Sequence, residues 1–488
     1  MSIDPPAPSP ELSGGIDAEG AGDAGAAGGL FAPERRQLVV GLVLTITLVA
    51  FEAMAVAAIM PDVKDDLGGL GLYGWVFSGF FLASLVGIVV AGQLADSHGL
   101  VLPYAVGLGL FAAGLVIGGA AVSMPMLIAG RIMQGFGAGA IPATGYAAIA
   151  RGIPSALRPR MFAVLSTAWV VPGVVGPSAA LGLEHALSWR FVFFVLVPLV
   201  VVAAVMTIPV LRTLGPDDAE VAPTATEIAT RRTRERLHLR KVLALVGGVA
   251  AVFLAASGVP APVAVVLVLV GLPVGINALV HLLPVGTLRL RPGVPATVAV
   301  RGLLTFGFFA ADAYVPLAVV DGRNGSSWIA GAALTVSALT WTAASWIQAR
   351  YIERVGPRRL DQTGFGALAI GVALMLGVAL GLPVGLTVVA WAIAGFGIGM
   401  AYAPQAVTVL ASAKPGEEGA ASAGIQLSDA VGIALGTGLA GGVIALGDGA
   451  GWSVDRSVTW VFALALVGSL GGLLASGRLP MKVPAQAT

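Results

Sequence analysis

The sequence predicts an all-α polytopic membrane protein, built from two six-helix halves and a two-helix insert, with fourteen transmembrane helices. Three observations support this prediction: an apolar composition, a series of long apolar segments, and an internal repeat. Of the 488 residues, 57% are hydrophobic and only 11% are charged, whereas soluble domains carry about 25% charged residues. Because a soluble chain of this length could not hide so much apolar surface from water, lipid must surround most of it.

Fourteen apolar segments approach the length that a membrane helix requires, which is about 20 residues. They lie at approximately 38–60, 73–95, 102–121, 125–149, 161–183, 190–212, 241–258, 262–284, 295–320, 328–348, 362–381, 384–410, 419–445 and 457–476. The seventh and eighth segments are separated only by Gly258–Ala261, so a single re-entrant hairpin is the alternative for this pair.

The distribution of Lys and Arg gives an independent check on the span count. With both termini assigned to the cytoplasm, 21 Lys and Arg residues fall inside, 4 fall outside, and Arg131 and Arg301 remain within spans. Positive charge is retained in the cytoplasm, so the asymmetry supports this orientation. Arginine outnumbers lysine 23 to 4 in a chain rich in Ala, Gly and Val, as in GC-rich bacterial genes. We expect a multi-pass protein of the bacterial plasma (inner) membrane.

An internal repeat has an offset near 260 residues. The matching pairs are Gly135–Gly139 with Gly395–Gly399, Asp96–Gly99 with Glu353–Gly356, and Glu52 with Asp312. The predicted parts are a disordered cytoplasmic tail (1–33), a six-helix half (34–212), a basic cytoplasmic loop (213–240), a two-helix insert (241–284), a second six-helix half (295–478) and a cytoplasmic tail (479–488). Duplicated halves around a central site are typical of transporters, and a duplicated scaffold without transport is the alternative.

Several function classes are disfavoured. The net charge of +1 does not indicate nucleic-acid binding, and the absence of cysteine excludes disulfides, thiolate metal sites and cysteine nucleophiles. The four histidines are scattered, so we expect no metal site and no cofactor. No Gly-Lys pair occurs, so the chain has no Walker A loop. An ion gradient is therefore the expected energy source.

Five motifs resemble those of major facilitator superfamily transporters, specifically the drug:proton antiporters with fourteen spans. They are Glu52 followed by Pro61–Asp62, the loop Gly92–Gly99, the span motif Arg131–Gly137, Gly176–Pro177, and Ser188–Phe194. The resemblance covers residues 34–478 and implies the major facilitator fold, multidrug efflux and a part in antibiotic resistance. It also implies gating roles for the loop residues of both copies, which are Gly92, Asp96, Gly99, Glu353, Arg354, Gly356, Arg358 and Arg359.

Ionisable residues inside the spans are the candidates for coupling and substrate binding, because charge in the bilayer is costly. Glu52 and Arg131 are expected to pair, either to carry a proton or only to tie two helices together. Asp312 either carries a second proton or attracts a cationic substrate, unless it is only a water-exposed residue at the outer mouth. We expect Arg301, about 16 Å away along the same helix, to snorkel to the cytoplasmic interface. Asp429 is a further candidate.

Small residues and aromatic residues complete the candidates. We expect the first group to allow close helix approach; it comprises Gly135, Gly137, Gly176, Pro177, Gly395, Gly397 and Gly399, beside Gln134. Phe136, Trp169, Phe309, Trp341 and Trp346 either line an apolar cavity or face lipid.

The predicted function is secondary active transport: proton-coupled efflux of hydrophobic or cationic small molecules by a monomer in the lipid bilayer. Proton-coupled uptake or exchange of a specific metabolite is the alternative within transport. A polytopic membrane enzyme is disfavoured because the chain has no Cys and no His-Glu-x-x-His motif. A non-transporting sensor would carry a sizeable soluble output domain, and the sequence shows none.

Overall fold

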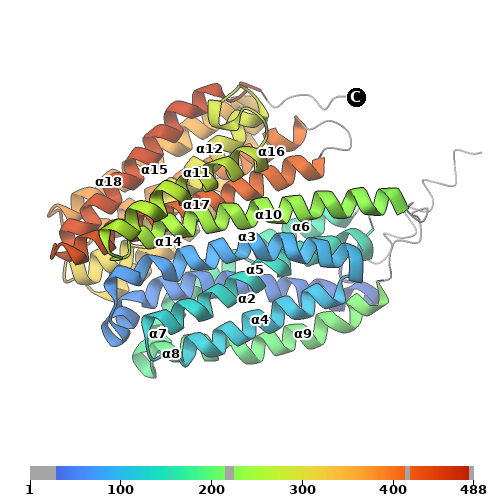
Figure 1. Cartoon of the computed structure of the whole chain (residues 1–488), viewed down its shortest axis with the longest axis horizontal. Coiled ribbons are helices and arrows are strands. Elements are labelled where there is room, and N and C mark those ends of the chain that lie inside the picture. Colours follow the sequence, from blue (N-terminus) through green and yellow to red (C-terminus); the bar gives the residue numbers. More distant parts are fainter. Residues whose placement is uncertain (1–28, 155–156, 215–224, 413–417, 483–488) are drawn as a thin grey trace, which may run out of the picture.

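The computed structural model describes residues 29–154, 157–214, 225–412 and 418–482, and these residues form a bundle of long helices (Figure 1). The first half contains α2 (Pro33–Leu67), α3 (Tyr73–His98), α4 (Val101–Gly119), α5 (Met124–Gly152), α6 (Arg158–Thr167), α7 (Val170–Ala186), α8 (Trp189–Phe194) and α9 (Leu196–Thr213). The middle contains α10 (Ala225–Ala255) and α11 (Ala261–Leu282). The second half contains α12 (Val294–Asp312), α13 (Val315–Leu317), a π-helix (Ala318–Gly322), α14 (Ser327–Val355), α15 (Pro357–Ala379), α16 (Leu386–Ala411), α17 (Glu418–Gly449) and α18 (Val454–Ala475).

Each of the fourteen predicted segments coincides with helix, but the number of membrane spans stays a prediction. Within the described ranges, eleven helices are long and apolar enough to cross a membrane. The other three predicted segments correspond to α5, to α6 with α7, and to α14. Helix α5 carries Arg131, Gln134 and several glycines, which lower its hydropathy. Helices α6 and α7 have 10 and 17 residues, so neither alone reaches the usual length of about 20.

Helix α2 is longer than the sequence predicted. Its 35 residues extend about 52 Å, which exceeds the thickness of the hydrocarbon core. Pro33 occupies the first turn, where its fixed φ and missing N–H cost nothing. The helix stops at Gly68, whose φ of 67° is in the left-handed region. Glu52 therefore lies near the middle of α2.

The insert is helical over more of the chain than expected. Residues 225–240, which we predicted as part of a basic loop, form the first turns of α10. The reason is local, because this stretch is rich in Arg, Glu, Leu and Ala, which are good helix formers. Helices α10 and α11 pack against each other where Gly248 meets Gly271 and Gly275. Both are long and apolar enough to span a membrane, by length and composition. The predicted tails lie outside the described residues over 1–28 and 483–488.

The helices before α10 pack mainly on one another, and so do the helices after α11. Figure 1 shows them as two groups, blue to light green and yellow to red, with α10 running alongside. Contacts between the groups join α3 to α17 and α7 to α14. Gly74 touches Gly441 through the backbone, and the rings of Tyr73 and Tyr314 lie 5.4 Å apart. These contacts lie at or near the end of the bundle that carries the α2–α3 loop.

The repeated glycines lie where helices come closest. A Cβ on Gly135 would lie 2.9 Å from the carbonyl carbon of Phe80 in α3. A Cβ on Gly137 would lie 2.8 Å from the backbone nitrogen of Phe111 in α4. Gly397, the repeat counterpart of Gly137, approaches α15 in the same way, 2.6 Å from the backbone nitrogen of Leu368. Neighbouring helices therefore contact each other through their backbones in both halves.

Replacing Gly137 with Val is expected to separate α4 from α5 and to lower stability by about 1–3 kcal/mol, the usual cost of overpacking. The measurement is the thermal unfolding temperature of the purified protein in detergent. Gly109→Val is the matched control, because a Cβ at Gly109 meets nothing within 4 Å. Equal unfolding temperatures for the two variants would show that backbone contact at Gly137 is not important.

Candidate functional site

The first polar cluster joins α2 to α5. Glu52 and Arg131 form an ion pair, and their side chains are 1% and 2% exposed. The Arg131 guanidinium also donates to Gln134 Oε1 at 2.9 Å and to the Val76 carbonyl at 3.1 Å, and it lies 4.3 Å from the centre of the Phe80 ring. The arginine is thus held by three helices, while Glu52 Oε2 is buried without a hydrogen-bond partner.

This arrangement has a clear chemical consequence. A buried charge without its partner is costly, so loss of either charge would destabilise the contact between α2 and α5. Protonation of Glu52 would remove the charge attraction, while the contacts of Arg131 with Val76 and Gln134 could remain. Because Glu52 is sealed from solvent in this conformation, a proton can reach it only after the surrounding helices move.

The second copy of the repeat has a different pair at the same positions. Asp312 and Trp391 lie 260 residues after Glu52 and Arg131, respectively. The Trp391 indole Nε1 donates to Asp312 Oδ1 at 2.7 Å. An ion pair in the first half is therefore matched by a hydrogen bond from a neutral donor in the second half. Trp391 is a residue that the sequence analysis did not single out, although the 260-residue offset from Arg131 would have found it.

Asp312 also marks a break in its helix. Helix α12 ends at Asp312, and the chain continues through the short α13 and a π-helix. Pro316, four residues later, has no N–H to donate to the Asp312 carbonyl, so the α-helical bond is missing there. The equivalent residue in α2 is Val56, and α2 continues past it to Leu67. Asp312 is half-buried, and irregular backbone of this kind is tolerated in membranes where protein or a water-filled cavity surrounds it.

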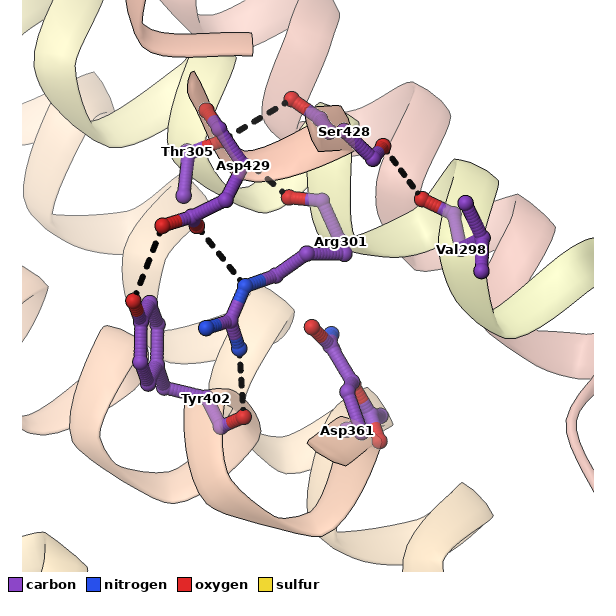
Figure 2. A network of polar contacts seen from close by, with 9 residues as sticks. Val298, Arg301, Thr305, Asp361, Tyr402, Ser428 and Asp429 are labelled. Atoms are coloured by element: carbon purple, nitrogen blue, oxygen red, sulfur yellow. Dashed lines mark hydrogen bonds and ion pairs between the residues drawn. The ribbon is translucent and has the colours of Figure 1, made fainter. Parts of the chain in front are cut away.

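A third polar cluster surrounds Arg301, and it shows that the predicted position of this side chain was wrong (Figure 2). Arg301 does not snorkel to an interface, because its side chain is only 6% exposed and pairs with Asp429 at 2.7 Å. It also donates to the Tyr402 carbonyl at 2.6 Å and lies 3.1 Å from the centre of the Tyr402 ring. The Tyr402 hydroxyl donates to the other Asp429 oxygen at 2.9 Å. The carboxylate on α17 supplies the counter-charge that the sequence could not place beside α12.

Asp361 is a buried acid that the sequence analysis missed. It is completely buried, accepts a 2.6 Å bond from Gln405 Nε2, and its Oδ2 has no hydrogen-bond partner. The predicted span began at residue 362, so Asp361 was taken as part of the preceding loop. The observed helix α15 begins at Pro357. An acid one residue outside an apolar segment was the signal that could have found it.

The loop-motif residues lie at matching helix ends. Gly99 and Gly356 end α3 and α14 with φ angles of 76° and 83°, a left-handed conformation that favours glycine. The backbone of Asp96 lies in the last turn of α3. Gly92 lies on α3. The loop residues of the second copy are on α14 and α15, where Arg358 is half-buried and the others are exposed: Glu353, Arg354 and Arg359.

The other candidates divide between the interior and the surface. Gly176 faces α2, where a Cβ would lie 3.6 Å from the Met54 Cβ. Trp169 and Trp346 are 46% and 65% exposed. Phe309 and Trp341 lie beside other aromatic rings. No group of three or more His, Asp or Glu residues that could hold a metal ion occurs in the described part of the chain.

Comparison with known proteins identifies the family. The model of the Major Facilitator Superfamily matches residues 42–437. The chain belongs to this superfamily, as its motifs indicated, and is a multi-pass membrane transporter and not an enzyme.

Relatives and solved structures agree with this assignment. A Mycobacterium tuberculosis protein named probable multidrug-efflux transporter MT1670 is 29% identical over 465 residues, which are 89% of this chain and 93% of the relative. The Acurin A biosynthesis cluster MFS-type transporter of Aspergillus aculeatus is 30% identical over 167 residues, which are 34% of this chain and only 30% of that protein. An auto-inhibited POT family peptide transporter has the same fold, with a TM-score of 0.65 at 15% identity over 93% of this chain and 99% of that one.

The Arg301–Asp429 pair generates a prediction about stability. Removing one partner leaves the other charge buried and alone, which typically costs about 3–5 kcal/mol. Arg301→Met and Asp429→Asn should therefore each lower the unfolding temperature in detergent. The double variant should be more stable than the sum of the two losses predicts. Strictly additive losses would contradict direct coupling of the two charges.

Proposed function

We propose that the chain exports hydrophobic small molecules, including organic cations, in exchange for protons across the bacterial plasma membrane. The observation that carries this proposal is the set of carboxyl groups within membrane helices: Glu52, Asp312, Asp361 and Asp429. Ionisable groups in such positions are retained for function because they are costly. The name of the M. tuberculosis relative as a probable multidrug-efflux transporter supports efflux.

Glu52 is the proposed main proton carrier. Its carboxylate is held by Arg131, and one of its oxygens has no partner that would have to be displaced by an arriving proton. Protonation weakens the tie between α2 and α5, and deprotonation restores it. A proton can thus bias the packing of these helices between two states, which is the requirement for coupling to transport.

The described conformation fits one stage of alternating access. We place the α2–α3 loop on the outer side of the membrane, because this orientation puts most Lys and Arg residues in the cytoplasm. The two proposed six-helix halves then meet at their outer ends. Lys64 of α2 pairs there with Asp321 of the second half, next to the contact between Tyr73 and Tyr314. We assign this conformation as closed to the outside, and we propose that the protein acts as a monomer.

The orientation can be tested with reporter fusions. Fusions after residues 225, 288 and 480 are expected to report the cytoplasm, and a fusion after residue 450 is expected to report the exterior. This pattern requires that the two insert helices return the chain to the cytoplasm, either as two spans or as a re-entrant hairpin. A reporter after residue 288 that is active only outside the cell would contradict the fourteen-span topology.

The coupling role of Glu52 gives a transport prediction. Glu52→Gln removes the titrating group but keeps the size of the side chain, so substrate-driven proton release and proton-driven transport should both be lost. Glu52→Asp should retain part of the activity with a shifted pH optimum. The measurement is transport of a panel of dyes into everted vesicles, together with proton release from purified protein in detergent.

The control for this experiment is Asp448→Asn, which removes an exposed acid near the end of α17. It should still release protons on substrate addition, because Asp448 lies outside the buried clusters. Undiminished proton release from Glu52→Gln would move the role to another acid. Accumulation driven in the opposite direction would favour uptake of a specific metabolite.

A further inference from the structure

We propose that Asp312 binds the positively charged group of an organic-cation substrate, and that Trp391, Phe308 and Trp341 form the aromatic wall beside it. This inference rests on the proposed transport of organic cations and assigns the place where the cation binds. It follows from three features of the second half: an acid without a counter-ion, a broken helix, and a row of aromatic rings.

The first feature is the unbalanced charge of Asp312. At the corresponding place in the first half, Arg131 neutralises Glu52. In the second half the arginine is replaced by Trp391, which donates one hydrogen bond but carries no charge. Among the described residues, no Lys, Arg or His side chain lies within 4 Å of the Asp312 carboxylate. A cation bound at Asp312 would therefore supply the positive charge that no side chain provides there.

The neighbouring charges are already engaged. Arg301 on the same helix pairs with Asp429 and lies about 16 Å along the helix from Asp312. Lys64 pairs with Asp65 and Asp321 beyond the helix break. Asp361 accepts a hydrogen bond from Gln405 on a different pair of helices. None of these interactions involves the Asp312 carboxylate, so a bound cation would not have to displace an existing ion pair.

The second feature is accessibility. Glu52 is 1% exposed inside a continuous helix, whereas Asp312 is half-buried at the end of α12. The break that Pro316 causes also deprives the Asp312 carbonyl of its usual helical donor. One residue thus presents a carboxylate and a backbone carbonyl without a helical partner. Discontinuous membrane helices form ion and substrate sites in transporters for this reason.

The third feature is the row of aromatic rings that begins at the partner of Asp312. Trp391 stacks on Phe308 with 5.8 Å between ring centres and 27° between planes. Phe308 contacts Trp341 edge to face at 5.7 Å, and Trp341 lies 5.5 Å from Tyr402. Aromatic faces attract organic cations through their quadrupole. Trp391 and Phe308 are 0% and 3% exposed in this conformation, so the row becomes a surface for the apolar groups of a lipophilic cation at Asp312 only when the surrounding helices move.

The experiment measures binding and needs no gradient. Equilibrium dialysis of the purified full chain in detergent is carried out with tetraphenylphosphonium and with triphenylphosphine oxide, a neutral molecule with similar rings. Asp312→Asn is expected to weaken binding of the cation at least about tenfold, as for loss of a charge-assisted contact, and to change binding of the neutral probe less than about twofold. Asp455→Asn, at the start of α18, is the matched control and should bind both probes normally.

Variants of Trp391 test the cation site without changing Asp312. Trp391→Arg recreates the pairing of the first half, so the new guanidinium should occupy Asp312 and exclude the cation. Trp391→Phe retains an aromatic ring without a charge and should bind the cation more tightly than Trp391→Arg does. Both variants are checked by size-exclusion chromatography, so that loss of fold is not mistaken for loss of binding.

The outcomes separate this inference from the proposed function. Unchanged cation binding by Asp312→Asn, or equal losses for both probes, would overturn the role of Asp312 as the cation site. Cation binding that depends on Asp312 but releases no proton supports this inference while contradicting proton exchange. Proton release by Glu52 with cation binding independent of Asp312 supports exchange and overturns the site assigned here.

Discussion

The cost of an unpaired charge inside the membrane governs this structure. Of the three buried arginines in the described structure, Arg35 lies in the first turn of α2. Arg131 and Arg301 lie inside helices, and each is paired with a carboxylate from another helix. Each also binds a backbone carbonyl and lies over an aromatic ring. These contacts replace the water that the guanidinium would lose on burial. The helices α2, α3 and α5 in one half, and α12, α16 and α17 in the other, are therefore tied together by the need to satisfy one cation.

Arg131 and Arg301 are paired at different positions along their bundles of helices. As a result, Glu52 and Asp312, which are related by the repeat, have different surroundings. At the position of the Glu52–Arg131 pair, the second half has Asp312 and Trp391, and its own arginine lies three turns away along α12. Glycine-mediated helix contacts occur at repeat-related positions in both groups of helices, while the polar residues at repeat-related positions differ. One acid is neutralised and sealed, and the other is uncompensated and partly accessible. This difference fits the exchange proposed above, in which proton and substrate compete through conformation and not by direct displacement.

The polar clusters lie among helices that pack closely through glycines. Glycines bring the backbones of α4 and α5, and those of α15 and α16, into contact with each other, and interiors packed this closely transmit strain. The two groups of helices contact each other near the end with the α2–α3 loop, where aromatic rings and small residues meet, and where α7 packs on α14. In the proposed mechanism, a change in the packing of α2 on α5 is transmitted through these contacts.

The sequence by itself determined the helical membrane class, the location of every long helix, the repeat offset and the membership of the family. These follow from apolar length, charge and glycine spacing, which are local properties of the chain. It also indicated the pairing of Glu52 with Arg131, because two opposite charges in apolar spans require partners. Only the tertiary structure shows that Arg301 forms an ion pair with Asp429, that Trp391 donates a hydrogen bond to Asp312, and that Asp361 is buried. These contacts join helices far apart in the chain, and their partners depend on how the helices are rotated and packed, which no local pattern encodes.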